Sequence, residues 1–239
     1  MSNGWEFSAR AWIDSMGERG DWAREHVLDP VMLGRVAAGR FRNALDVGCG
    51  EGRFCRLLNA AGVTATGIDP TAALLETARR RDPSGDYRLG RAERLEFEAA
   101  SFDLVVSYVT LVDIADFRAA IGEMTRVVKP GGSLLIANLT GFTSACAAQG
   151  WVRDPEGRGL HFPVDNYLDE FPFWLEWAGM RVENWHRPLA AYMAALLDCR
   201  LQLTFFAEPE PVSGTGSRRD DFRRVPWFVV MEWRRPRVA

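Results

Sequence analysis

Short apolar runs alternate with amphipathic stretches along most of the chain. The run at residues 102–109 is apolar nearly throughout, which is typical of a central strand in a parallel sheet. Dense apolar runs of this kind predict strands at residues 43–47, 65–68, 87–91, 102–109, 133–139, 201–207 and 227–233.

Between these runs, apolar residues recur at intervals of three and four, as on one face of a helix. This spacing predicts helices over residues 5–16, 21–28, 30–38, 53–61, 116–128 and 189–198, and another that begins near residue 71. Pro30 suits a first-turn position. The alternation of strands and helices predicts an α/β fold, and 239 residues suffice for one such domain with additions.

A glycine turn follows the first predicted strand. Gly48, Gly50 and Gly52 alternate before the helix at 53–61, and glycines let the backbone approach a bulky ligand closely. A dinucleotide fingerprint requires its third glycine one residue later, where this chain has Arg53. Glu51 adds a negative charge that disfavours a pyrophosphate. The turn therefore predicts a nucleoside ligand with a cationic or zwitterionic tail.

Asp69 ends the second predicted strand, 19 positions after Gly50. At this separation, an acid can accept hydrogen bonds from both hydroxyls of a ribose. It can also cap the helix that begins near Thr71, and the two roles are compatible. Asp69 is the strongest single candidate for ligand binding.

Residues 43–139 resemble the class I S-adenosylmethionine-dependent methyltransferases. The resemblance rests on an ordered set of motifs, which begins with the run Leu-Asp-Val-Gly-Cys-Gly-Glu-Gly at 45–52 and includes Arg-Val-Val-Lys-Pro-Gly-Gly-Ser-Leu-Leu-Ile at 126–136. It implies a Rossmann-like, seven-stranded, mostly parallel sheet with helices on both faces and a last strand antiparallel to the fifth. It also implies S-adenosyl-L-methionine as the cofactor and S-adenosyl-L-homocysteine as its product.

The same resemblance implies which residues hold the cofactor. Ala92 and Glu93 occupy the positions beside the adenine, although Arg91 stands where many relatives have an aspartate, and Glu93 also suits a solvated helix cap. Tyr108 is expected beside the reacting methyl group. The implied cofactor set is Asp46, Gly48, Cys49, Gly50, Asp69, Pro70, Ala92, Glu93, Ser107 and Tyr108.

The chain divides into four predicted segments. Residues 1–42 form a helical cap, 43–140 the cofactor-binding core, 141–187 an inserted lid, and 188–239 the last helix and two strands. The insertion is rich in aromatic residues and exceeds the length of an ordinary connection, which favours a functional role. It contains a predicted β-hairpin around Ala178 and Gly179. Residues 209–224 are polar and predict a mobile loop.

Methyl transfer is an in-line displacement, and a base is needed only when the acceptor must lose a proton. Asp113 follows the fourth strand, where relatives place a histidine or an acid, but it can also cap a helix. The histidines can equally be packed residues. The candidate bases are His161, His186, Asp113, Tyr108 and Tyr192. The candidate substrate contacts are Trp12, Met16, Tyr108, His161, His186 and Tyr192.

Composition and charge limit the expected partners and the expected location of the protein. A formal net charge of −3 gives no bulk attraction to nucleic acid. The four cysteines form no Cys-x-x-Cys pair and have no metal-ligand spacing, so reduced thiols, no metal and a cytoplasmic location are expected. The sequence shows neither a signal peptide nor an apolar run long enough for a membrane span, and a monomer or homodimer is expected.

These observations predict a methyltransferase that acts on an oxygen or nitrogen of a small aromatic or heterocyclic metabolite. One alternative is a non-catalytic, cofactor-binding regulatory or partner subunit. A second is methyl transfer to RNA or protein, which the absence of an Asn-Pro-Pro-Tyr-like tetrapeptide at 107–110 makes less favoured for nucleic-acid amines. A dehydrogenase is disfavoured by Arg53.

Overall fold

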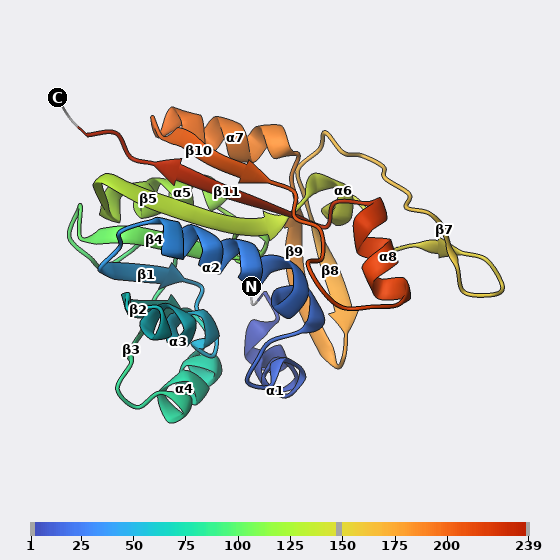
Figure 1. Cartoon of the computed structure of the whole chain (residues 1–239), viewed down its shortest axis with the longest axis horizontal. Helices are drawn as coiled ribbons and strands as arrows, with labels where there is room; N and C mark the ends of the chain where they lie inside the picture. The colour runs from blue at the N-terminus through green and yellow to red at the C-terminus, as the bar shows by residue number, and fades with distance from the viewer. Residues whose placement is uncertain (1–2, 147–149, 238–239) are drawn as a thin grey trace.

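A computed structural model describes residues 3–146 and 150–237 (Figure 1). The main sheet has the strand order β10-β11-β5-β4-β1-β2-β3 within that part of the chain. Strands β1 to β5 run parallel, and β11 lies antiparallel between β5 and β10. The strands are β1 (Asn43–Val47), β2 (Thr64–Asp69), β3 (Asp86–Leu89), β4 (Phe102–Tyr108), β5 (Val128–Leu139), β10 (Gln202–Ala207) and β11 (Phe228–Arg234). The predicted Rossmann-like fold is confirmed.

Two apolar cores cover the two faces of the sheet. One core packs side chains of α5 and α7 against β1, β4, β5 and β11. The other packs α2, α3 and α4 against the opposite face. The helices are α2 (Asp29–Ala38), α3 (Arg53–Ala60), α4 (Ala72–Arg81), α5 (Phe117–Val127) and α7 (Leu189–Asp198). Helices therefore lie on both faces, as predicted.

The sheet reverses its order between β1 and β4. From β1 the chain steps outward through β2 to β3, and it then returns to the other side of β1 as β4. Open α/β sheets bind ligands outside the carboxyl ends of the strands at such a switch point. The glycine turn at 48–52 lies there.

The N-terminal part differs from the prediction of two short helices. After α1 (Trp5–Met16), a π-helical turn η1 (Arg24–Leu28) continues directly into α2. Pro30 has no N–H to offer the preceding turn, so the regular ladder is interrupted there and the helix widens. The two predicted helices are thus one continuous run.

Residues after Leu139 form two hairpins. One is a small arm made by β6 (Val152–Arg153) and β7 (Gly159–His161), which extends to the side of the molecule in Figure 1. The other is the predicted hairpin, which joins β8 (Phe171–Trp177) to β9 (Met180–His186) through Ala178 and Gly179. Both turn residues have positive φ. A short helix, α6 (Gly141–Ser144), precedes them. Residues 1–2, 147–149 and 238–239 of the predicted segments lie outside the described residues.

The prediction of a loop over residues 209–224 is wrong in its second half. Ser217–Arg224 forms α8, whose apolar residue Phe222 stacks on Trp227 with ring centroids 4.8 Å apart. A single apolar side chain gives no helical period in the sequence, so this helix depends on a tertiary contact. The described residues include no helix with the length and apolar character needed to cross a bilayer.

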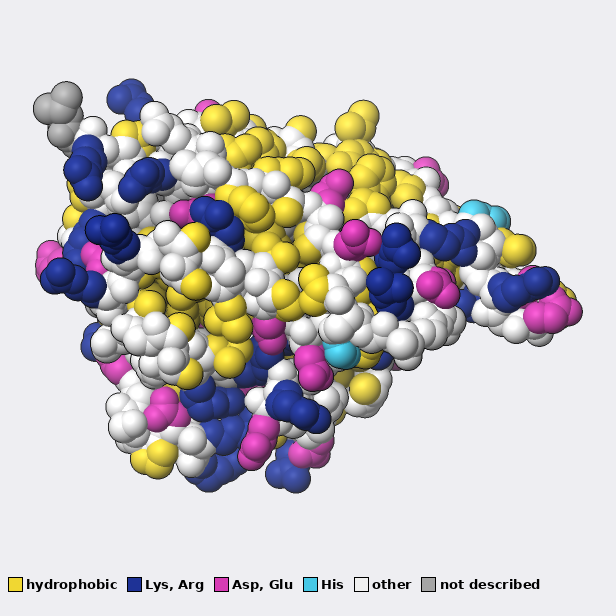
Figure 2. Space-filling model, viewed as in Figure 1, with side chains coloured by type: hydrophobic (Ala, Val, Ile, Leu, Met, Phe, Trp, Pro, Cys, Tyr) yellow, Lys and Arg dark blue, Asp and Glu magenta, His cyan; other side chains and the backbone are white. Residues whose placement is uncertain are grey.

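The open edge of the sheet at β10 carries apolar side chains. Leu203 and Phe206 on this strand and Leu197 on α7 are exposed, and Figure 2 shows hydrophobic side chains gathered over this part of the surface. The site described below lies at the opposite half of the sheet, around β1, β2 and β4.

Candidate functional site

A cavity of about 370 Å³ opens at the carboxyl ends of β1, β2 and β4. Its floor is the glycine turn, and its roof is formed by the first turns of α1 and the end of β9. The residues that line it are Asn3, Trp5, Glu6, Trp12, Arg24, Gly48, Gly50, Ile68, Asp69, Pro70, Thr71, Leu74, Gly90, Arg91, Ala92, Glu93, Tyr108, Val109, Thr110, Asp113, Ile114, Ala115, Glu183 and Trp185.

The glycine turn needs its glycines for conformation and for space. Gly48, Gly50 and Gly52 all have positive φ. A Cβ on Gly52 would lie 2.6 Å from the ring of Tyr87, whereas a Cβ on Gly50 would meet only Trp12, at 3.9 Å. Gly50 therefore presents bare backbone to the cavity.

Asp69 is buried at the end of β2 and binds the glycine turn. Its Oδ2 accepts a hydrogen bond of 2.9 Å from the Gly50 N–H, and its Oδ1 accepts one of 2.8 Å from the Thr71 N–H. Burial raises its pKa, and these N–H groups oppose the shift. The carboxylate keeps lone pairs toward the cavity, because each oxygen accepts only one of these bonds.

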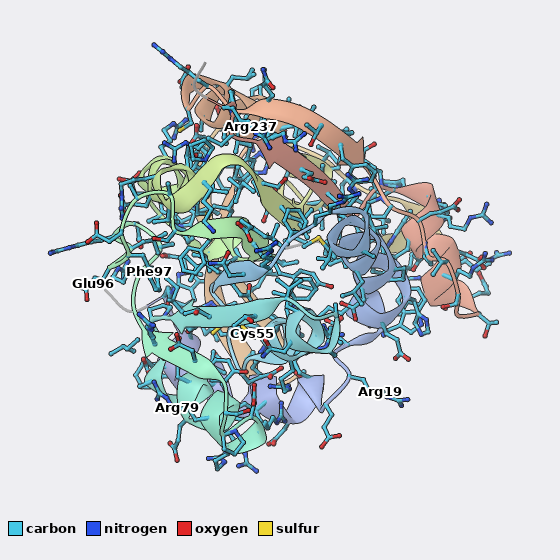
Figure 3. All side chains as sticks on the ribbon, turned by 60° about the vertical axis from the view of Figure 1, so that its left-hand side comes forward. Arg19, Cys55, Arg79, Glu96, Phe97 and Arg237 are labelled. Carbon is cyan, nitrogen blue, oxygen red and sulfur yellow. The ribbon has the colours of Figure 1, made fainter. Side chains whose placement is uncertain are left out.

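Asp46 lies at the end of β1 beside a recess of about 60 Å³ next to the main cavity. It is 1% exposed, and burial raises its pKa to about 7. Its Oδ2 accepts a weak bond from the Cys55 thiol at 3.5 Å, but its Oδ1 has no partner. Figure 3 shows Cys55 inside the molecule. An unpartnered buried carboxylate oxygen fits a cationic group placed in the recess.

The sequence predicts that Glu51 places a negative charge in the glycine turn for a cationic ligand tail, but its charge is already paired within the protein. Its carboxylate is buried and forms ion pairs with Arg56, at 3.0 Å, and with Arg81, at 3.2 Å. The negative charge of the turn is thus already neutralised by the protein. The acid that suits a cationic tail is Asp46, two residues before the first glycine of the turn.

Asp113 follows β4 and lines the cavity. Its carboxylate accepts hydrogen bonds from the amide of Asn184 on β9 and from the indole of Trp5 on α1. Burial raises its pKa to about 8. The predicted candidate therefore lies in the pocket as a carboxyl held by two neutral donors.

Tyr108 also lines the cavity, but its hydroxyl is engaged. It donates a hydrogen bond of 2.7 Å to Asp29 on α2, and Asp29 is ion-paired with Arg53. Burial holds the pKa of Tyr108 well above its ordinary value. A phenol in this state is a poor proton acceptor, so the structure contradicts its candidacy as a base and leaves its place beside the cofactor as a prediction.

The two histidines lie outside the cavity. His186 is fully buried; its Nδ1 lies 2.7 Å from Ser144 Oγ and its Nε2 lies 3.0 Å from the Tyr167 carbonyl. Burial lowers its pKa. His161 is exposed on the arm. Side chains alternate along β9, so His186 faces α6 while Glu183 and Trp185 line the cavity.

Four other predicted residues are placed apart from the main cavity. Tyr192 is buried on α7 against Phe117, with ring centroids 5.0 Å apart. Met16 lines only the smaller recess, together with Cys49, whereas Trp12 lines both spaces. Ser107 is fully buried within β4. The expectation that Tyr192 and the histidines line the acceptor site is corrected by this arrangement.

The comparisons with known proteins agree with this geometry. The pattern of a methyltransferase domain matches residues 45–136. A ubiquinone biosynthesis O-methyltransferase of Xanthomonas axonopodis pv. citri is 32% identical over 190 residues, which cover 74% of this chain and 78% of that protein. This chain belongs to the class I S-adenosylmethionine-dependent methyltransferases.

Other methyltransferases are similar to this chain in sequence or in structure. A malonyl-[acyl-carrier protein] O-methyltransferase of Salmonella typhimurium is 34% identical over 60% of this chain and 53% of its own length. The chain spans about half the length of the first curated relatives that it matches. A solved S-adenosylmethionine-dependent methyltransferase from Mesorhizobium loti superposes with a TM-score of 0.75, at 26% identity, over 89% of this chain and 98% of that one.

The family's cofactor is S-adenosyl-L-methionine, and the residues present fit it. Gly50 offers bare backbone, Asp69 keeps free lone pairs, and Asp46 has an unpartnered oxygen beside the recess. These features match a ribose and a cationic methionine tail.

Several pocket residues of this methyltransferase family member have no signal in the sequence pattern. Arg24 lies over Trp12, with its guanidinium 4.9 Å from the ring centroid, and is ion-paired with Asp21 at 2.8 Å. Trp5, Glu183 and Asn184 reach the site from opposite ends of the chain. Only their proximity in the fold identifies them, because none belongs to a motif.

Proposed function

We propose that this protein is an S-adenosylmethionine-dependent methyltransferase that acts on an oxygen or nitrogen atom of a small aromatic or heterocyclic metabolite. The observation that carries the proposal is that the glycine turn, Asp69 and the unpartnered oxygen of Asp46 lie around the main cavity and its neighbouring recess. When bound, the cofactor supplies an electrophilic methyl group on a sulfonium.

The chain's own residues would hold and orient that cofactor. Asp69 would accept the ribose hydroxyls, since a charged acceptor makes bonds typically worth about 1.5–3 kcal/mol each. Ala92 and Glu93 would lie beside the adenine, because they line the cavity next to β3. Asp46 would face the ammonium of the methionine tail.

The acceptor would lie against the roof of the cavity. Trp5 and Trp12 come from α1 and Trp185 comes from β9, so aromatic faces surround the space beyond the glycine turn. About 370 Å³ must accommodate cofactor and acceptor together, which supports a small acceptor. This geometry favours a metabolite over the alternatives of RNA or a folded protein.

A non-catalytic partner subunit is the main competing function. The aromatic-lined space beside the cofactor features supports catalysis, since a subunit that only binds cofactor needs no acceptor chamber. A cytoplasmic setting and a monomeric or homodimeric state complete the proposal.

Calorimetric titration with S-adenosylmethionine, S-adenosylhomocysteine and NAD tests the proposal. We expect binding of the first two and none of NAD, and formation of S-adenosylhomocysteine with at least one member of a metabolite panel. Asp69→Ala should weaken cofactor binding at least tenfold. Asp86→Ala, which removes an acid on β3 outside the cavity, is the matched control. Preferential binding of NAD would refute the proposal.

A further inference from the structure

We propose that the acceptor is a basic amine that enters the pocket as an ammonium ion, and that Asp113 receives its proton. This inference rests on the proposed function and specifies the chemistry of the same site. It is carried by the charges that line the cavity, by the way Asp113 is held, and by the aromatic faces around it.

The cavity has an excess of acids over cations. Its acidic lining residues are Glu6, Asp69, Glu93, Asp113 and Glu183. Its two cationic lining residues are both engaged: Arg24 pairs with Asp21 at 2.8 Å, and Arg91 pairs with Glu93 at 2.8 Å. Over residues 3–146 and 150–237, neither Asp113 nor Glu183 forms an ion pair. Among the described residues, the pocket thus contains acids without a cationic partner, whereas both of its cations already have an acidic partner.

Two of the remaining acids of the lining already have partners, whereas Glu6 on α1 forms no ion pair over residues 3–146 and 150–237. Asp69 binds the glycine turn, and Glu93 is paired with Arg91. Asp113 and Glu183 lie instead under the aromatic roof, on the stretch after β4 and on β9. An ammonium ion in this part of the cavity favours the ionised form of both acids, whereas a carboxylate acceptor would add a like charge.

Asp113 is fixed in position by its donors. Trp5 and Asn184 hold the carboxylate from two different elements. The charged groups that face it are Asp69, which raises its pKa, and Arg24, which lowers it. Since burial raises that pKa to about 8, the Asp113 carboxyl is mostly protonated at pH 7 without a ligand. A bound ammonium ion lowers the pKa and favours the carboxylate, which can then accept the proton.

The aromatic roof suits the same ligand. Trp5 and Trp12 meet edge to face with centroids 5.1 Å apart, and Trp185 lines the same cavity. Tryptophan faces attract cations through the negative charge of the ring, and Arg24 already lies over Trp12 and Arg187 over Trp185. The ammonium ion would therefore meet the ring of Trp5.

The chemical step balances without another reactant. The ammonium gives one proton to the Asp113 carboxylate, and the freed nitrogen lone pair forms the new N–C bond. The C–S bond of the methyl donor breaks and its electron pair stays on sulfur. The products are a methylated ammonium and S-adenosylhomocysteine, and Asp113 returns its proton to solvent.

The test compares three ligands that share one ring and differ in charge: benzylamine, benzyl alcohol and benzoate. Each is titrated into the protein saturated with S-adenosylhomocysteine, and binding is followed by calorimetry and by tryptophan fluorescence. We expect benzylamine to bind at least tenfold more tightly than either of the others. Equal affinities, or a preference for benzoate, would overturn the inference.

Asp113→Asn keeps the shape of the side chain and removes its charge. It should weaken benzylamine binding at least tenfold while leaving S-adenosylhomocysteine and benzyl alcohol binding unchanged. Asp14→Asn, which removes an exposed acid of α1, should change none of these values. If Asp113→Asn weakens S-adenosylmethionine but not benzylamine binding, then Asp113 serves the sulfonium and the inference fails. Absence of S-adenosylhomocysteine binding to the unmodified protein would instead refute the proposed function.

Discussion

At the scale of single residues, Asp46 couples cofactor binding to stability. Its carboxyl is buried with one oxygen unpartnered, and its pKa is raised from 3.8 to about 7. Because the folded state binds this proton more tightly than the unfolded state, stability from this residue is full below about pH 4 and decreases as the pH rises to about 7. At neutral pH the ionised Asp46 carboxylate therefore lowers the stability of the ligand-free protein. When a cation is bound beside it, the same carboxylate strengthens binding.

Asp46→Asn should raise the stability of the ligand-free protein at pH 8 and weaken cofactor binding. We expect a higher Tm by a few degrees, since about 1 kcal/mol corresponds to about 2–4 °C in a chain of this size. Thermal unfolding and calorimetric titration measure the two effects. Asp103→Asn is the control, because its expected effect on the Tm is the opposite. Burial tends to raise the pKa of Asp103, but Lys129 and two backbone N–H groups hold that pKa below its ordinary value. That variant should lower the Tm at pH 7.

Tyr108→Phe separates a packing role from a catalytic one. The change removes the hydrogen bond to Asp29 and leaves the Asp29–Arg53 ion pair in place. We expect a loss of about 1–2 kcal/mol of stability with turnover within tenfold of the unmodified protein. A fall of a hundredfold or more in kcat, at unchanged cofactor affinity, would restore Tyr108 as a base.

At the scale of elements, β9 builds the site together with the stretch after β4. Arg187, at the end of β9, is buried and donates hydrogen bonds to the carbonyls of Leu111, Ile114 and Ala115. Its guanidinium also lies 4.3 Å from the ring centroid of Phe117. This one side chain joins the hairpin to the segment that carries Asp113.

Arg187→Met should loosen that segment. Three carbonyls lose their donor, two of them at buried bonds, and we expect a loss of about 3 kcal/mol or more in the free energy of unfolding. Hydrogen exchange at residues 111–115 should rise, and the KM for the acceptor should increase more than kcat falls. Arg181→Met, on the same strand with an exposed side chain, should leave all three measurements nearly unchanged.

Much of the core could be predicted from local patterns. The strands and helices between residues 43 and 139 can be predicted from the spacing of apolar residues and the positions of glycines. This works because the buried face of each element is apolar and repeats with the period of that element. The Asn184–Asp113 contact and the Arg187 anchor join residues more than 70 positions apart. Likewise, Phe222 anchors α8 through Trp227 without any periodic signal. Such contacts arise only in the folded chain and leave no pattern in the sequence. For the same reason the sequence could not show that His161 and His186, predicted as candidate bases, lie outside the cavity.

At the scale of the whole molecule, the cavity is closed by parts that are distant in sequence. The Ser8 hydroxyl on α1 donates a hydrogen bond of 3.0 Å to the Arg181 carbonyl on β9, and it accepts one from the Arg181 N–H. Helix α1 also packs against α4. The roof therefore belongs to no single segment of the chain.

Ligand binding should stabilise these distant parts together. At a free concentration of one hundred times Kd, S-adenosylhomocysteine should add about 2.7 kcal/mol of stability. Hydrogen exchange should slow in both α1 and β9, since both line the cavity, and should stay unchanged in the β6–β7 arm. Slowing in the glycine turn alone would contradict a shared roof.

The pairing of α1 with β9 also bears on how the protein matures during translation. Ser8 and Arg181 are 173 positions apart, so at about 5–20 residues per second the nascent helix waits roughly 10–35 s for its partner strand. During that interval Trp5 and Trp12 have no strand to cover them. Strands β10 and β11 follow β9 in the chain, so the chamber and the β10–β11 side of the sheet are both completed late in synthesis, and a ribosome stalled before β9 would leave neither finished.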